Sequence, residues 1–173
     1  VGPGGIGKTR LALSVAEDIS AEFPDGVYFV NLAAITDPDQ VLLAIGGAAG
    51  IPIEGDAIDA LSSEFQDQQV LLVIDNFEHV AEGGSSVADL LGRSPGLKVL
   101  ATSRVPLRIM SEYEYTLEPL GLPATGSDRP DSVSASDAVR LFIDRALAVI
   151  PGFSIDEENA SPVASIVRIV DGL

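Results

Sequence analysis

The sequence predicts an α/β fold with a parallel sheet, followed by a smaller helical unit. Segments 27–32, 70–74 and 98–102 have the composition of strands, and the last two are apolar enough to be buried on both faces. Segments with helical spacing separate them, and this alternation is typical of parallel sheets. Beyond a stretch at 121–134 that is rich in Gly, Pro, Ser and Asp, only helical periodicity remains.

Each element follows from a local pattern. The first helix carries Leu11, Val15 and Ile19 at four-residue spacing, so we expect this face to pack on the sheet. Asp37 and Pro38 suit the N-cap and first position of a helix that runs to about residue 49. The other expected elements are helices at 57–65 and 80–91, a strand at 113–117, a helix opening near Ser134, and a helix at 160–170.

The charge of the chain narrows the classes of partner. Its 173 residues contain 26 acidic and 10 basic side chains, a formal net charge of −16. Such a field repels nucleic acid and anionic membranes, so we expect this segment to bind neither directly. There is no cysteine to form a disulfide or a thiolate metal site. Since no apolar run reaches the roughly 18 residues of a membrane span, we expect a cytoplasmic location.

Both ends are expected to be cut points of a longer protein. Val1 stands directly before a glycine-rich loop, so the strand expected there is reduced to this residue, and the chain stops at residue 173 without a polar tail. The predicted organisation is a core at 1–120, a linker at 121–134 and an incomplete helical lid at 135–173.

The strongest motif lies at the start of the chain. It matches G-x-x-x-x-G-K-[ST] and consists of Gly2, Pro3, Gly4, Gly5, Ile6, Gly7, Lys8 and Thr9. Glycines allow backbone N–H groups to surround phosphate oxygens, Lys8 reaches the β and γ phosphates, and the Thr9 hydroxyl is a Mg²⁺ ligand. Arg10 is near the phosphates, although a surface role is the simpler interpretation. The motif predicts binding of ATP or ADP with Mg²⁺ and a P-loop NTPase three-layer sandwich.

Further candidates follow the later strands. Asp75 directly follows the strand at 70–74, and a carboxylate at the carboxyl end of such a strand can hold Mg²⁺ through water. Without the glycine-rich motif upstream, Asp75 would be interpreted as a cap of the next turn. Arg104 follows the strand at 98–102 and is a candidate γ-phosphate sensor, with a solvated loop arginine as the alternative. Asn76 and Glu78 flank the Asp75 turn and are candidates to position a water molecule. His79, the only histidine, is interpreted as a second-layer or surface residue.

The chain resembles the bacterial STAND ATPases, in particular the NB-ARC-like predicted ATPase domain of large LuxR-type and AfsR-type regulators. The segments that carry the resemblance are GPGGIGKTRLALSVA, VLLVIDNFEHV, LKVLATSR, EPL, DAVRLFIDRA and VDGL. The resemblance implies that Gly2–Thr9 is the Walker A motif, Asp75 the Walker B aspartate and Arg104 the sensor arginine. Gly172 and Leu173 would be the first half of the GLPL motif. Asn76 departs from the family, since many relatives have a second aspartate there.

The leading hypothesis is a nucleotide-driven switch in a signalling or transcriptional regulator. Slow ATP hydrolysis would control its conformation and its ATP-dependent homo-oligomerisation, and other domains of the same chain would read its state. Any contact with DNA would belong to a domain outside this segment. The alternatives are a P-loop kinase acting on a small acceptor, and a module that binds nucleotide without turnover.

Overall fold

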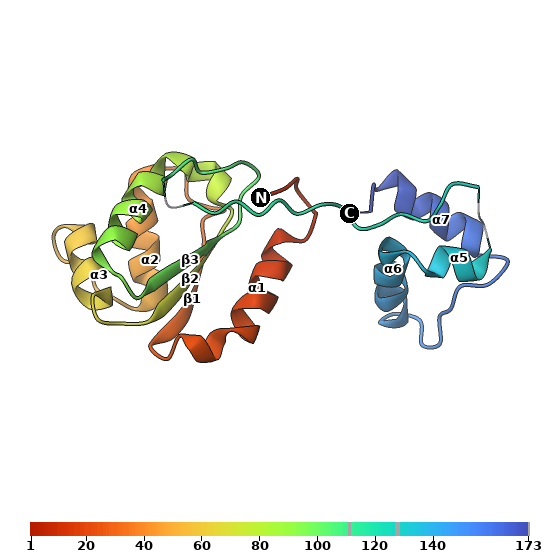
Figure 1. Ribbon diagram of the computed structural model, residues 1–173, viewed down its shortest axis with the longest axis horizontal. Helices are drawn as coiled ribbons and strands as arrows, with labels where there is room; N and C mark the ends of the chain where they lie inside the picture. The colour runs from red at the N-terminus through yellow and green to blue at the C-terminus, as the bar shows by residue number, and fades with distance from the viewer. Residues whose placement is uncertain (111, 127–128, 173) are drawn as a thin grey trace. The chain divides into compact units, whose positions relative to one another are not determined.

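The computed structural model describes residues 1–110, 112–126 and 129–172 (Figure 1). The chain divides into two compact units, residues 1–116 and 117–173. The elements of the first unit are α1 (Lys8–Asp18), β1 (Gly26–Asn31), α2 (Val41–Ala49), α3 (Ala57–Phe65), β2 (Val70–Asp75), α4 (Gly84–Arg93) and β3 (Leu97–Ala101). The helices of the second unit are α5 (Pro130–Ser134), α6 (Asp137–Leu147) and α7 (Ala160–Ile169).

The first unit is a three-layer α/β sandwich. Its strands pair in parallel in the order β1-β2-β3, so β2 is central. Figure 1 shows α1 on one face of this sheet and α2, α3 and α4 on the other. The side chains of β2 alternate accordingly: Leu72 and its like-facing neighbours join the α2–α4 core, whereas Leu71 and Val73 pack with α1. Burial on both faces explains why this strand is uniformly apolar, and the predicted fold class is confirmed.

Helix α1 turns a different face to the sheet from the one that the sequence pattern indicates. Ala12 and Ala16 are its buried residues and pack with Leu71 and Val73 of β2. Leu11 is 41% exposed. The expected Leu11, Val15 and Ile19 face was therefore wrong for Leu11, because small alanine side chains allow the helix to approach the sheet closely.

Two further elements differ from the expected boundaries. The helix expected at 80–91 begins as a short 3-10 helix, η3 (Phe77–Gly83), which kinks at Val80 before α4 starts. The segment 113–117 was expected to be a strand and is not one. Within the described residues, it contributes one backbone hydrogen bond, from the Val1 nitrogen to the Tyr115 oxygen at 2.6 Å, and one hydrogen bond is too few to form a ladder.

Val1 and Gly2 nevertheless lie where a strand before the P-loop was expected. The Gly2 amide donates to the Ser103 oxygen, 3.3 Å away, just beyond the end of β3. On its other side, Val1 contacts Tyr115. These two residues therefore run between the end of β3 and the segment at 113–117, which brings the glycine-rich loop to the carboxyl ends of β2 and β3.

The second unit has its own core and begins earlier than expected. Helices α5, α6 and α7 enclose a small apolar cluster, and Val133 is fully buried within it. Residues 130–134, assigned to a linker from composition, thus form a helix of this unit, and the boundary lies at 116/117. Residues 127 and 128 of the expected linker lie outside the described residues. Helix α6 begins at Asp137 with Ser136 as its N-cap, later than the start expected near Ser134.

Gly96 provides a test of how closely the loops that precede β2 and β3 are packed against each other. A Cβ placed on Gly96 would lie 2.2 Å from the backbone oxygen of Gln68. We expect Gly96→Ala to lower the free energy of unfolding by about 1–3 kcal/mol, because backbone atoms must move apart. Gly92→Ala in α4 is the control: nothing lies within 4 Å of its Cβ, and a gain of about 0.5–1 kcal/mol is expected. Equal urea midpoints for wild type and Gly96→Ala would contradict this packing.

Candidate functional site

The glycine-rich loop leads directly into α1 with a conformation that favours glycine. Gly5 and Gly7 have φ values of 82° and 96°, in the left-handed region. Lys8 folds back over the loop, and its Nζ donates to the carbonyl oxygens of Gly2 at 2.8 Å and Pro3 at 2.9 Å. The lysine charge is thus held over the concave side of the loop, where a phosphate would compete for the same donor.

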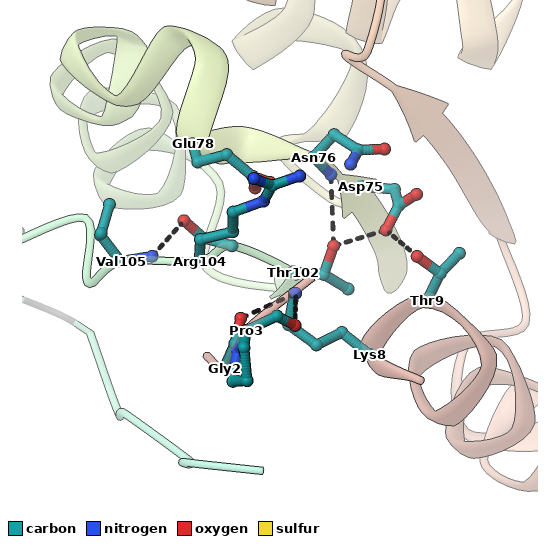
Figure 2. A network of polar contacts seen from close by, with 11 residues as sticks. Gly2, Pro3, Lys8, Thr9, Asp75, Asn76, Glu78, Thr102, Arg104 and Val105 are labelled. Atoms are coloured by element: carbon teal, nitrogen blue, oxygen red, sulfur yellow. Dashed lines mark hydrogen bonds and ion pairs between the residues drawn. The ribbon is translucent and has the colours of Figure 1, made fainter. Parts of the chain in front are cut away.

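Asp75, at the end of β2, is hydrogen bonded to the first turn of α1. Its side chain is only 5% exposed at the end of β2. The Thr9 hydroxyl donates to Asp75 Oδ1 at 2.6 Å, and the Thr102 hydroxyl donates to the same oxygen (Figure 2). Because β2 is the central strand, its carboxyl end brings Asp75 to the first turn of α1. Thr9 and Asp75, each a candidate for Mg²⁺ binding from the sequence, therefore lie within hydrogen-bond distance of each other.

Thr102 belongs to this network and was not among the candidates from sequence. It follows β3, is buried, and accepts a hydrogen bond from the Asn76 amide at 3.2 Å while it donates to Asp75. Its own backbone oxygen accepts from the Phe77 amide at 3.0 Å. The signal that pointed to it was available: a threonine at the end of the strand predicted at 98–102, at the same sheet edge as Asp75.

Arg104 and Glu78 were assigned separate roles from sequence, but they contact each other. Arg104 Nε lies 3.0 Å from Glu78 Oε1; the Glu78 side chain is 10% exposed and that of Arg104 is 60% exposed. A Cβ on Gly4 would lie 3.5 Å from Arg104 Cζ and Nη2, so the guanidinium rests against the loop. Figure 2 shows the guanidinium and the Glu78 carboxylate turned toward each other.

Asn76 occupies the turn between β2 and η3. Its φ and ψ of 63° and 39° are left-handed, a conformation that asparagine and aspartate tolerate better than other non-glycine residues. His79 and Arg10 are both exposed. For His79 this agrees with the surface interpretation, whereas Arg10 is exposed and also lines the cavity described next.

A cavity of about 320 Å³ gathers most of the candidates. Its lining residues are Gly4, Gly5, Gly7, Lys8, Thr9, Arg10, Asn76, Glu78, Thr102 and Arg104. Gly2, Pro3 and Ile6 are not among them, so they belong to the motif without lining this cavity. The lining supplies cations and backbone N–H groups for phosphates, and it lies next to the hydroxyl and carboxylate oxygens of Thr9 and Asp75.

The oxygen donors at this edge fit Mg²⁺. Thr9 Oγ1 and Asp75 Oδ1 are 2.6 Å apart, and Mg²⁺ sites of this kind use one or two protein oxygens, with phosphate oxygens and water completing the shell.

Gly172, the described half of the expected GLPL segment, lies in the turn after α7, and its amide donates to the Val167 oxygen at 3.0 Å. Leu173 lies outside the described residues. In the described part of the chain, no helix combines the length and the apolar composition of a membrane span.

Comparison with known proteins gives similarity at two levels. A Mycobacterium tuberculosis protein with the name "Putative HTH-type transcriptional regulator" is 39% identical over 176 residues, which span 99% of this chain and 18% of that protein. Regulatory protein AfsR of Streptomyces griseus is 37% identical over 114 residues, 60% of this chain and 11% of that protein. No family model matches the chain.

A solved structure supports the fold. The ORC2 protein of Aeropyrum pernix, determined as ADPNP–ADP complexes, aligns with a TM-score of 0.51 and 15% sequence identity, covering 100% of this chain and 63% of that one. The chain therefore has the fold of the P-loop ATPases, and its sequence is similar to those of transcriptional regulators and of AfsR.

Proposed function

We propose that this chain is the ATP- and ADP-binding switch domain of a signal-transducing or transcriptional regulator, of the STAND or NB-ARC-like type. One observation carries the proposal: Lys8, Thr9 and Arg104 line a single cavity, and Asp75 is hydrogen bonded to Thr9 at its edge. The similarity to transcriptional regulators supports a regulatory role for the protein, and we propose a cytoplasmic location with it.

The residues divide the work of nucleotide binding. The backbone of Gly2–Thr9 surrounds the phosphates, and Lys8 exchanges the carbonyl oxygens of Gly2 and Pro3 for phosphate oxygens. Thr9 and Asp75 hold Mg²⁺, which when bound neutralises charge on the phosphate oxygens. Arg104 interacts with the γ-phosphate, so ATP and ADP differ in interaction energy with the domain, as a switch requires.

The proposed hydrolysis is slow because the water-orienting group is weak. Asn76 can accept a hydrogen bond from water but is a poor base. Glu78 is the nearby carboxylate; within the described residues its Oε2 is buried and has no hydrogen-bond partner, while Oε1 is engaged by Arg104. Persistence of bound ATP would suit a domain whose state is read by other domains of the same chain and by ATP-dependent homo-oligomerisation. With a net charge of −16, direct nucleic-acid contact is assigned to other segments.

Single-turnover hydrolysis with Mg²⁺ in the full-length protein tests the proposal. We expect turnover below the roughly 1 s⁻¹ of slow ordinary enzymes. Asn76→Asp should raise the rate, since a second carboxylate then faces the water and the left-handed turn is retained. Glu78→Gln should slow hydrolysis about tenfold to a hundredfold.

The alternatives give different results in the same assay. Transfer of phosphate to a small acceptor, with no phosphate release when the acceptor is absent, would show that the domain is a kinase and not a switch. Tight nucleotide binding with no phosphate release over many hours would show that the domain binds nucleotide without turnover. Unchanged hydrolysis in Glu78→Gln would show that another group orients the water.

A further inference from the structure

The ion pair between Glu78 and Arg104 has one buried and one exposed partner. Glu78 is 10% exposed and Arg104 60% exposed. Glu78 is the second residue of η3 and directly follows Phe77. Phe77 is fully buried in the main core, and its backbone amide donates to the Thr102 backbone oxygen at 3.0 Å. The carboxylate is therefore attached to a fixed part of the fold. The Arg104 side chain is long and mostly exposed, so without the ion pair it would sample many rotamers.

The atoms of the contact leave the phosphate-binding end of the arginine available. Glu78 Oε1 pairs with Nε, the nitrogen nearest the side-chain stem. Among the described residues, no hydrogen bond or ion pair uses Nη1 or Nη2, and Nη2 lies against Gly4 of the phosphate loop. Because the guanidinium is planar and rigid, fixing Nε also fixes the direction in which the two terminal nitrogens point.

We propose that Glu78 is a positioning residue for nucleotide specificity: it holds Arg104 by Nε so that Nη1 and Nη2 face the γ-phosphate, and it thereby sets the preference for ATP over ADP. This inference rests on the proposed function and adds a role for Glu78 that is separate from orienting water. An arginine ordered before binding loses less entropy when the γ-phosphate arrives. ADP has no γ-phosphate, so its affinity does not depend on this ordering.

The experiment compares affinities of Mg-ADPNP and Mg-ADP in the full-length protein by titration calorimetry, so hydrolysis plays no part. Glu78→Met keeps the side-chain length but removes the acceptor, whereas Glu78→Gln removes the charge and keeps an acceptor. Arg104→Gln, alone and with Glu78→Met, tests whether the effect passes through Arg104. Arg93→Gln, which breaks the exposed ion pair with Asp59 in the same unit, is the matched control.

We expect Glu78→Met to lower the ADPNP-to-ADP affinity ratio about fivefold to tenfold, the size of a partly exposed charged hydrogen bond. Glu78→Gln should retain most of the ratio, Arg104→Gln should lower it similarly to Glu78→Met, and the double variant should show no further loss. ADP affinity should be unchanged in every variant.

Three results would overturn this role of Glu78. A raised ratio in both Glu78 variants would mean that the carboxylate competes with the γ-phosphate for Arg104. An unchanged ratio with slower hydrolysis would restrict Glu78 to water. An equal loss of ADPNP and ADP affinity with a lowered unfolding temperature would mean a structural role only. Failure of the proposed function is distinct, since wild-type protein would then bind neither nucleotide.

Discussion

Replacing Lys8 by alanine is expected to lower the affinity for Mg-ATP by about 10²-fold or more, since charged hydrogen bonds to two phosphates are lost. In the structure the Lys8 amine bonds to two carbonyl oxygens of its own loop, 2.8 and 2.9 Å away. Those contacts hold the charge where phosphates would lie, so the variant loses both the charge and a constraint on the loop. Equilibrium titration with a fluorescent nucleotide measures the change.

Lys98→Ala is the matched control for this variant. Lys98 is the other lysine of the two in the chain and is exposed on β3. It should bind nucleotide as the wild type does. If Lys8→Ala also binds within about threefold of wild type, a change too small for the loss of even one charged hydrogen bond, the assignment of the loop to phosphate binding is wrong.

Asp75→Asn should reduce Mg²⁺-dependent hydrolysis by about 10²–10³-fold, the usual cost of removing one electrostatic contact from a reaction site. The buried carboxylate accepts hydrogen bonds from Thr9 and Thr102. An amide of the same shape keeps an oxygen that can accept hydrogen bonds from both hydroxyls but lacks the charge that attracts a divalent cation. Hydrolysis is followed as the Mg²⁺ concentration is varied, and thermal unfolding verifies that the variant is folded.

Asp59→Asn serves as the control for neutralising an acid. Asp59 lies on the surface of α3 and pairs with Arg93 at 2.7 Å, so its loss should leave hydrolysis unchanged. Retention of wild-type Mg²⁺ dependence in Asp75→Asn would remove Asp75 from the proposed metal site.

Local patterns were sufficient where one chemical requirement decides the structure. The helix expected at 57–65 is α3, because Asp56 caps it through the Ile58 and Asp59 amides and its apolar spacing is regular. Asp37 is likewise an N-cap as expected, accepting from the Asp39 amide at 3.0 Å, although the helix it caps is the short 3-10 helix η2 (Pro38–Gln40) that precedes α2. The uniformly apolar segment at 70–74 is typical of a strand covered on both faces, and this made the sandwich predictable.

Local patterns failed where the choice depended on a neighbour distant in sequence. The spacing of Leu11, Val15 and Ile19 describes a helix face, but Ala12 and Ala16 are the residues buried against the sheet, with Ile19 packed beside them and Leu11 exposed. The composition of 113–117 suits a strand, yet strand formation requires a partner to supply a ladder. Residues 130–134 have a linker's composition, but Val133 is buried by α6 and α7.

By itself, the sequence predicted an α/β sandwich with a glycine-rich loop that matches the P-loop motif, and it indicated that Thr9, Asp75 and Arg104 belong to one sheet edge. Their spacing from strand ends contains that information, because parallel strands bring their carboxyl ends together. Only the tertiary structure decided that Thr102 shares the Asp75 carboxylate and that Glu78 holds Arg104. Those contacts join residues 26 or 27 positions apart along the chain, and no local pattern specifies which side chains meet when separate elements pack together.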